Sequence, residues 1–162
     1  MLTATELEED PDRVATLIAH TNVDPTATRR EICPLCEQVR EYEFCSAVVV
    51  PYHAALAHEI VGDEANVAAV IGFPYGVQNS AAKRAECRAI DEYVDEFDMV
   101  MNRTAFANGD ADAVVEDVEA VRDAVGDATL KCIVESPALS AEETARAAEL
   151  AETGGADVVK TA

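Results

Sequence analysis

The sequence contains no tryptophan, and aromatic residues make up only 5% of its 162 positions. Long apolar runs are also missing, since none approaches the about 18 residues that a membrane-spanning helix requires. The opening segment MLTATELEED has neither the basic nor the apolar part of a signal peptide. We therefore expect no membrane association and a cytoplasmic location.

Positive charge is scarce. Twelve basic residues stand against 32 acidic ones, which gives a formal net charge of −20. Nucleic acids and anionic lipids would repel such a surface, so neither is expected as a partner. The acidic residues lie between apolar runs such as SAVVV, VAAVIGF and LKCIV, which favours a folded core with a solvated acidic shell over a disordered chain. An acidic surface poor in lysine resembles that of cytosolic proteins from salt-loving (halophilic) organisms.

Cysteine is present in an odd number, five, and the residues are scattered through apolar segments. This pattern predicts reduced thiols in the core rather than a disulfide framework. Cys33 and Cys36 form a C-x-x-C motif, but it lies within an expected helix and has no second pair to complete a zinc site. We therefore expect core packing rather than a redox or metal role for this motif.

Six apolar segments of strand length alternate with segments of helical length. A first helix turn and a short strand are expected within RVATLIAHTNV, and the other strands at 44–50, 66–71, 96–101, 129–134 and 157–161. Helices are expected within TATRREICPLCEQVREY, after Pro51, and at 80–93, 111–125 and 141–153, with a capping box of Thr28 and Glu31 and an N-cap at Ser140. Strands joined by crossover helices form a parallel sheet. The length favours one domain, 1–162.

Charged residues inside the strands are the informative ones. Alternation places Asp98 and Asn102 on one face of their strand, Lys131 on a face of the next, and Lys160 on a face of the last. Three strands could therefore direct charges into one interior. The structural alternative is an ion pair between Asp98 and Lys131, with Lys160 frayed at an exposed terminus.

The sequence has nine arginines but only three lysines, Lys83, Lys131 and Lys160. An arginine stays protonated and forms no imine, so a retained lysine suggests chemistry that arginine cannot perform. Lys83 lies on a helix and is expected to be an ordinary surface residue. Lys131 is a candidate for the cation that keeps Lys160 nucleophilic, and Asp98 for a proton relay. This set predicts carbon–carbon bond cleavage or formation beside a carbonyl, with a dehydratase or a transaldolase as alternatives.

Six segments, in order, resemble the deoxyribose-phosphate aldolase family: IAHTNVDPTAT, VIGFPYG, EFDMVMN, NGD, LKCIVES and GADVVKTA. The family consists of cofactor-free class I aldolases with a TIM-barrel fold. The resemblance implies a lyase that reversibly cleaves 2-deoxyribose 5-phosphate, a phosphosugar, to glyceraldehyde 3-phosphate and acetaldehyde. It implies Lys160 as the Schiff-base lysine, Asp98 as the proton relay and Lys131 as the lysine of the preceding strand. Thr21 and Asn102 are the expected substrate-binding residues.

The sequence also departs from the family. Ala19 stands where the family usually has an aspartate, and Val48 and Val50 where it often has a cysteine and an asparagine. The family continues beyond VKT with a further strand, a second active-site lysine and phosphate-binding loops. We therefore expect an incomplete barrel of about six parallel strands, which forms a homo-oligomer or is completed by another segment. The alternative is a truncated, weak or inactive homologue that acts in assembly or binding.

Overall fold

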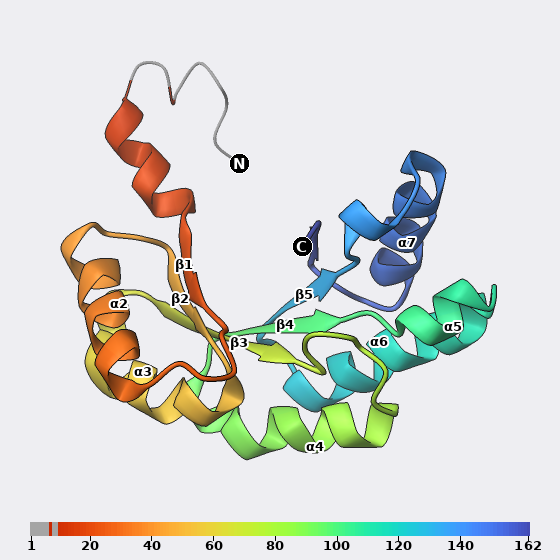
Figure 1. Ribbon diagram of the computed structural model, residues 1–162, viewed down its shortest axis with the longest axis horizontal. Coiled ribbons are helices and arrows are strands. Elements are labelled where there is room, and N and C mark those ends of the chain that lie inside the picture. The colour runs from red at the N-terminus through yellow and green to blue at the C-terminus, as the bar shows by residue number, and fades with distance from the viewer. Residues whose placement is uncertain (1–6, 8–9) are drawn as a thin grey trace.

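The computed structural model describes residue 7 and residues 10–162, and within them it contains one six-stranded parallel sheet. The strands are β1 (Ala19–Asn22), β2 (Ser46–Val49), β3 (Asn66–Ile71), β4 (Glu96–Val100), β5 (Thr129–Ile133) and β6 (Val158–Lys160). Their order in the sheet is their order in the sequence, so β1 and β6 form its two edges. The sheet curls into a half-barrel (Figure 1), which confirms the expected fold class.

Helices follow the strands and lie along the outer, convex side of the curled sheet (Figure 1). They are α2 (Arg29–Glu41), α3 (Ala54–Val61), α4 (Ser80–Ile90), α5 (Arg103–Ala107), α6 (Ala111–Val125) and α7 (Ala141–Thr153). Short 3-10 segments occur at η1 (Pro11–Leu17), η2 (Pro51–His53), η3 (Gly62–Glu64), η4 (Asp91–Tyr93) and η5 (Ser136–Ala138). In the part of the chain that is described, no helix has the length and apolar character needed to span a membrane.

Local hydrogen bonds start the helices where the sequence predicts. The Glu31 carboxylate accepts the backbone N–H of Thr28 at 2.9 Å, and the Ser140 hydroxyl accepts the backbone N–H of Glu143 at 3.2 Å. Both are capping boxes, which satisfy N–H groups that have no partner within the helix. The starts of α2 and α7 are thus encoded within a few residues of sequence.

The main core lies between the sheet and its outer helices. Phe97, Met99 and Leu130, on the outer faces of β4 and β5, are fully buried in one cluster with Val114 and Val118 of α6. A smaller cluster occupies the inner face and consists of Val48, Ala68 and Val70. Both faces of β2 and β3 are therefore mainly apolar, as is usual for a parallel sheet. The charged groups of the inner face are concentrated near β4, β5 and β6.

The expectation that Lys83 is a surface residue is wrong. Its side chain is fully buried between α4 and α6, and its Nζ donates to Asp117 Oδ2 at 2.5 Å and to the Val100 carbonyl at 2.8 Å. The Ser80 hydroxyl donates to the other carboxylate oxygen of Asp117 at 2.8 Å. Lys83 shares the inward face of α4 with Cys87, four residues later, so helical periodicity placed it in the core.

Candidate active site

The inner face of the sheet brings together three of the expected site residues. Asp98 and Lys131 are register partners on β4 and β5, and Lys160 pairs with Ile133 two residues further along. The Lys160 Nζ lies 2.6 Å from Asp98 Oδ2, and the Lys131 Nζ lies 3.9 Å from Asp98 Oδ1. Lys160 is therefore held by a carboxylate rather than frayed, and the Lys131 ammonium lies near the same carboxylate.

The members of this group differ in their access to solvent. The Asp98 side chain is fully buried, whereas the Lys160 side chain is 25% exposed. Within the described residues, Asp98 Oδ1 has no hydrogen-bond partner. An oxygen of this kind is costly to bury unless a nearby charge or water compensates it. The arrangement thus presents one amine to solvent above a buried carboxylate.

Glu96 is a member of the site that the sequence analysis missed. Lys131 Nζ donates to Glu96 Oε2, and the Asn66 side-chain amide donates to Glu96 Oε1 at 3.0 Å. The Glu96 residue is only 8% exposed. It precedes Asp98 by two positions, so the same alternation that selected Asp98 places both carboxylates on one face. We call Lys160, Asp98, Lys131 and Glu96 the lysine site.

The charge state of Lys131 follows from its surroundings. Burial acts to lower its pKa, but the hydrogen bond to Glu96 and the negative charges of Asp98 and Glu96 outweigh burial, so the pKa of Lys131 is raised. An amine of this kind stays protonated at neutral pH. Lys131 is therefore suited to act as a fixed cation rather than as a nucleophile.

The structure does not bring the two expected substrate-binding residues into the lysine site. The Asn102 side-chain oxygen accepts the backbone N–H of Ala105 at 3.0 Å and so caps α5. Thr21 lies on β1, at the opposite edge of the sheet from β6, and its hydroxyl donates to the Ala19 carbonyl at 3.0 Å. Among the described residues neither side chain is hydrogen-bonded to a member of the lysine site.

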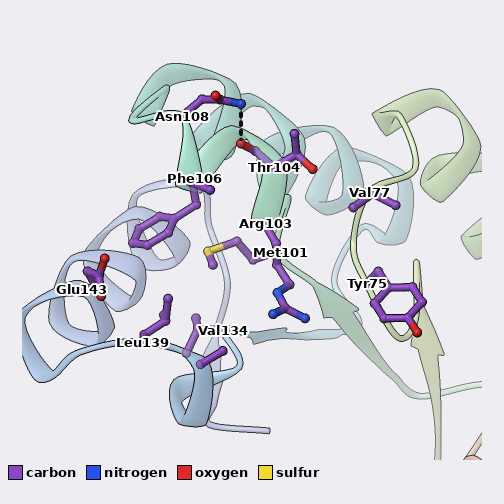
Figure 2. Close-up of a pocket in the computed structure, with 12 residues that line it drawn as sticks. Tyr75, Val77, Met101, Arg103, Thr104, Phe106, Asn108, Val134, Leu139 and Glu143 are labelled. Atoms are coloured by element: carbon purple, nitrogen blue, oxygen red, sulfur yellow. Dashed lines mark hydrogen bonds between the residues drawn. The ribbon is translucent and has the colours of Figure 1, made fainter.

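A cavity of about 700 Å³ lies at the carboxyl ends of β4 and β5 (Figure 2). Met101, Arg103 and Val134 line it, with Tyr75 in the loop after β3 (Figure 2). The cavity does not include the lysine site, although the Val134 N–H donates to the Lys160 carbonyl at 3.0 Å. The cavity therefore adjoins the backbone of the candidate nucleophile while the reactive side chains lie elsewhere.

In residue 7 and residues 10–162 there is no group of three or more His, Cys, Asp or Glu side chains that could hold a metal ion. All five cysteines are free, and burial raises the pKa of Cys36 to about 11 and that of Cys132 to about 12. These buried thiols are protonated and unreactive at neutral pH.

A curled parallel sheet with helices on its outer side is the architecture of TIM-barrel proteins. No protein-family model matches the chain. Among solved structures, the chain superposes on an aldolase designated QR15 with a TM-score of 0.86 and 32% identity, covering 90% of this chain and 66% of that one. It also superposes on the tetrameric deoxyribose phosphate aldolase from Aeropyrum pernix with a TM-score of 0.84 and 24% identity, covering 99% and 72%, a likeness of fold alone.

Curated relatives have higher identity. The chain is 42% identical over 150 residues to the deoxyribose-phosphate aldolase of Macrococcus caseolyticus, covering 91% of this chain and 68% of the relative. It is 40% identical over 154 residues to that of Thermococcus gammatolerans, with the same two shares. The chain thus spans about two thirds of the length of these relatives. It belongs to the deoxyribose-phosphate aldolase family.

Proposed function

We propose that the lysine site carries out aldol cleavage of 2-deoxy-D-ribose 5-phosphate to D-glyceraldehyde 3-phosphate and acetaldehyde. The observation that carries this proposal is the contact of 2.6 Å between the half-buried Lys160 amine and the fully buried Asp98 carboxylate. An amine beside a base, within reach of solvent, is the arrangement that a lysine imine requires. Membership of the aldolase family supports the same reaction.

In this proposal Lys160 is the nucleophile. Its unprotonated amine attacks the aldehyde carbon of the open-chain sugar, and loss of water gives a protonated imine. The bond between the second and third sugar carbons then breaks, and its electron pair moves into the imine to give an enamine. The proton of the third-carbon hydroxyl leaves to a base, and glyceraldehyde 3-phosphate departs. Protonation of the enamine carbon, followed by hydrolysis, releases acetaldehyde and restores the amine.

Asp98 and Lys131 have supporting roles in this scheme. Asp98 accepts and returns the protons of carbinolamine formation and of the sugar hydroxyl, directly or through one water. Lys131, whose raised pKa keeps it protonated, contributes the positive charge that favours the unprotonated form of a neighbouring amine. No metal and no organic cofactor takes part.

Thr21 and Asn102 are proposed as substrate contacts. The cap of α5 uses the Asn102 side-chain oxygen, which leaves its amide N–H groups available to a sugar hydroxyl. Thr21 Oγ1 donates to the Ala19 carbonyl at 3.0 Å and can still accept a hydrogen bond from a ligand. Substitution of either residue should raise KM more than it lowers kcat.

Borohydride reduction in the presence of acetaldehyde tests the proposal. We expect a two-carbon adduct on Lys160, found by mass spectrometry of the digested chain, and slower labelling in Asp98→Asn. Lys83 is the internal control, because its amine is fully buried in an ion pair and should stay unlabelled while the protein is folded. A folded chain in which Lys160 takes up no adduct would refute the proposal.

A role in assembly or binding is the second candidate, and one observation favours it. Val158 and Val159 on the edge strand β6 are 43% and 37% exposed, although they are apolar. Unpaired strand edges of this kind attract further strands. We propose that the chain forms a homo-oligomer or pairs with a complementing segment through these edges, which sedimentation or solution scattering would detect. Aldolase assays on deoxyribose with and without its phosphate, run on the same sample, separate the two candidates.

The cellular setting is proposed from composition. The net charge of −20 and the low lysine content favour a cytoplasm rich in salt over a secreted environment. A fluorescent fusion in the source cells would test the location.

A further inference from the structure

Lys131 lies between two carboxylates and is bonded to only one of them. Its Nζ donates to Glu96 Oε2 and lies 3.9 Å from Asp98 Oδ1, beyond hydrogen-bond distance. A small rotation of the Lys131 side chain would bring the ammonium onto Asp98. The other oxygen of Asp98 already binds Lys160 at 2.6 Å. Which carboxylate holds Lys131 therefore decides how far Asp98 is shared between the two lysines.

Glu96 is itself fixed in place. Asn66, the first residue of β3, donates its side-chain amide to Glu96 Oε1 at 3.0 Å, while Glu96 Oε2 receives the Lys131 ammonium. Both carboxylate oxygens are thereby used, and the residue is 8% exposed. A buried carboxylate with both oxygens bonded has one orientation, so its position is set by β3 as well as β4.

We propose that Glu96, oriented by Asn66, is a positioning residue that holds Lys131 away from Asp98 and so reserves Asp98 for Lys160. This role goes beyond the proposed aldolase chemistry and rests on it only for its effect on turnover. Glu96 touches no substrate in this scheme. It acts through Lys131.

The charged and titratable groups around Lys131 come from β4, from β6 and from the residue before β2. Glu96 and Asp98 extend from β4, Lys160 extends from β6, and the Cys45 thiol lies just before β2. With Glu96 present, the two lysines each have a carboxylate. Without its charge, two ammonium groups compete for Asp98, and each is stabilised less. The protonated form of Lys160 then loses part of its partner.

The protonation of Lys160 can be measured without any aldolase activity. Competitive labelling with trace acetic anhydride across a pH series reports, by mass spectrometry, the pH midpoint at which each lysine amine becomes reactive. In Glu96→Gln the midpoint at Lys160 should fall by about one pH unit, because Lys131 moves onto Asp98. The kcat for deoxyribose 5-phosphate should nevertheless fall about tenfold, with KM changed less than about twofold, because an Asp98 carboxylate bonded to Lys131 is a weaker base for the proton relay.

The matched control removes the lysine that is proposed to move. In Lys131→Met, adding Glu96→Gln should shift the Lys160 midpoint by only about 0.3 unit. Glu96 does not contact Lys160, and its charge acts on the Lys160 amine from further away than that of Asp98 does. A merely electrostatic or structural role of Glu96 would give the same shift in both backgrounds. Equal shifts with and without Lys131, or no shift in Glu96→Gln, would overturn the proposal.

A second variant leaves every charge in place. Asn66→Ser frees Glu96 Oε1 at an exposed position and should fold normally. The Lys160 midpoint is expected to fall in the same direction by a smaller amount, and an unchanged midpoint would contradict positioning by Asn66. The labelling assay stays readable if acetaldehyde forms no adduct on Lys160, so failure of the proposed function and failure of this inference are distinguishable.

Discussion

Two lysine–aspartate pairs of nearly equal length occupy opposite sides of the sheet. Lys83 and Asp117 lie 2.5 Å apart between α4 and α6, with side chains 0% and 1% exposed. Lys160 and Asp98 lie 2.6 Å apart on the inner face, with side chains 25% and 0% exposed. The first pair is sealed, and the second keeps its amine accessible from solvent.

The difference shows that lysine is present at these two positions for two separate reasons. A lysine with a flexible, compact ammonium fits a narrow buried site where Ser80 and the Val100 carbonyl complete its surroundings. At Lys160 the relevant property is instead the ability to lose a proton and form an imine. Composition alone treats the two lysines alike, whereas exposure of the amine separates them.

Replacement of the accessible lysine should have the largest effect on chemistry. Lys160→Arg keeps a cation beside Asp98 but cannot form an imine, so borohydride-trapped adduct should fall at least about 1,000-fold. The free energy of unfolding, measured with urea, should change by less than about 1 kcal/mol because the side chain already reaches solvent. Adduct that persists at another lysine of the folded variant would contradict the contrast between the two pairs.

Replacement of the sealed lysine, Lys83, should lower stability and leave the chemistry of Lys160 unchanged. Lys83→Met leaves the Asp117 carboxylate buried without its counter-charge, so the free energy of unfolding should fall by about 3–5 kcal/mol. Labelling of Lys160 per folded molecule should be unaffected. In Lys83→Met with Asp117→Leu, stability should recover in part, because no lone charge remains in the core. A single variant as stable as the unmodified chain would show that the pair is dispensable.

Salt should act on the acidic surface and spare the sealed pair. With a net charge of −20, self-repulsion weakens the compact state in dilute buffer, and at about 1 M salt the Debye length is only about 3 Å. We expect the thermal midpoint to rise by about 5 °C between low and molar salt. The loss of unfolding free energy caused by Lys83→Met should be the same in low salt and in molar salt. An unchanged midpoint would refute the halophilic interpretation of the composition.

The smallest expected effect on the free energy of unfolding comes from the exposed ion pair between Arg122 and Asp157. Asp157 accepts the Leu130 N–H and the Arg122 guanidinium, each at 2.8 Å, and the backbone bond is the main cause of its lowered pKa. A carboxylate whose folded-state pKa is depressed stabilises the fold above pH about 4 and ceases to do so as pH falls through the lower value. Asp157→Asn should cost about 0.5–1 kcal/mol at pH 7, since the side chain is 52% exposed. Urea unfolding should show the two proteins converging near pH 2.

The sequence predicted long, regular elements best. The strand at 66–71 and the helices at 111–125 and 141–153 have the predicted bounds. In contrast, β2 is shorter than the predicted 44–50, and α5 was missed because five residues are too few to show helical periodicity. Its start depends on the Asn102 cap, a contact that a local pattern does not distinguish from a ligand contact.

The site was predicted only as far as strand alternation reaches. Alternation correctly placed Asp98, Lys131 and Lys160 on one face, because residues paired in a parallel sheet point to the same side on neighbouring strands. Asn102 lies beyond the end of β4 at Val100, so strand alternation does not fix its face, and its role as a substrate contact stays a prediction. Which carboxylate binds Lys131 depends on Asn66 of β3, a partner that no spacing in the sequence reveals.

The order of the strands has a consequence for how the chain acquires its structure. Each strand pairs only with its immediate neighbours in sequence, from the pairing of Ala19 with Ser46 to that of Ile133 with Lys160. Every ladder therefore closes over only the helical segments between two successive strands, and no connection skips a strand. The strands also leave the ribosome in the order in which they lie side by side in the sheet. Lys160 lies on β6, so its pair with Asp98 can form only after β4 and β6 have both joined the sheet.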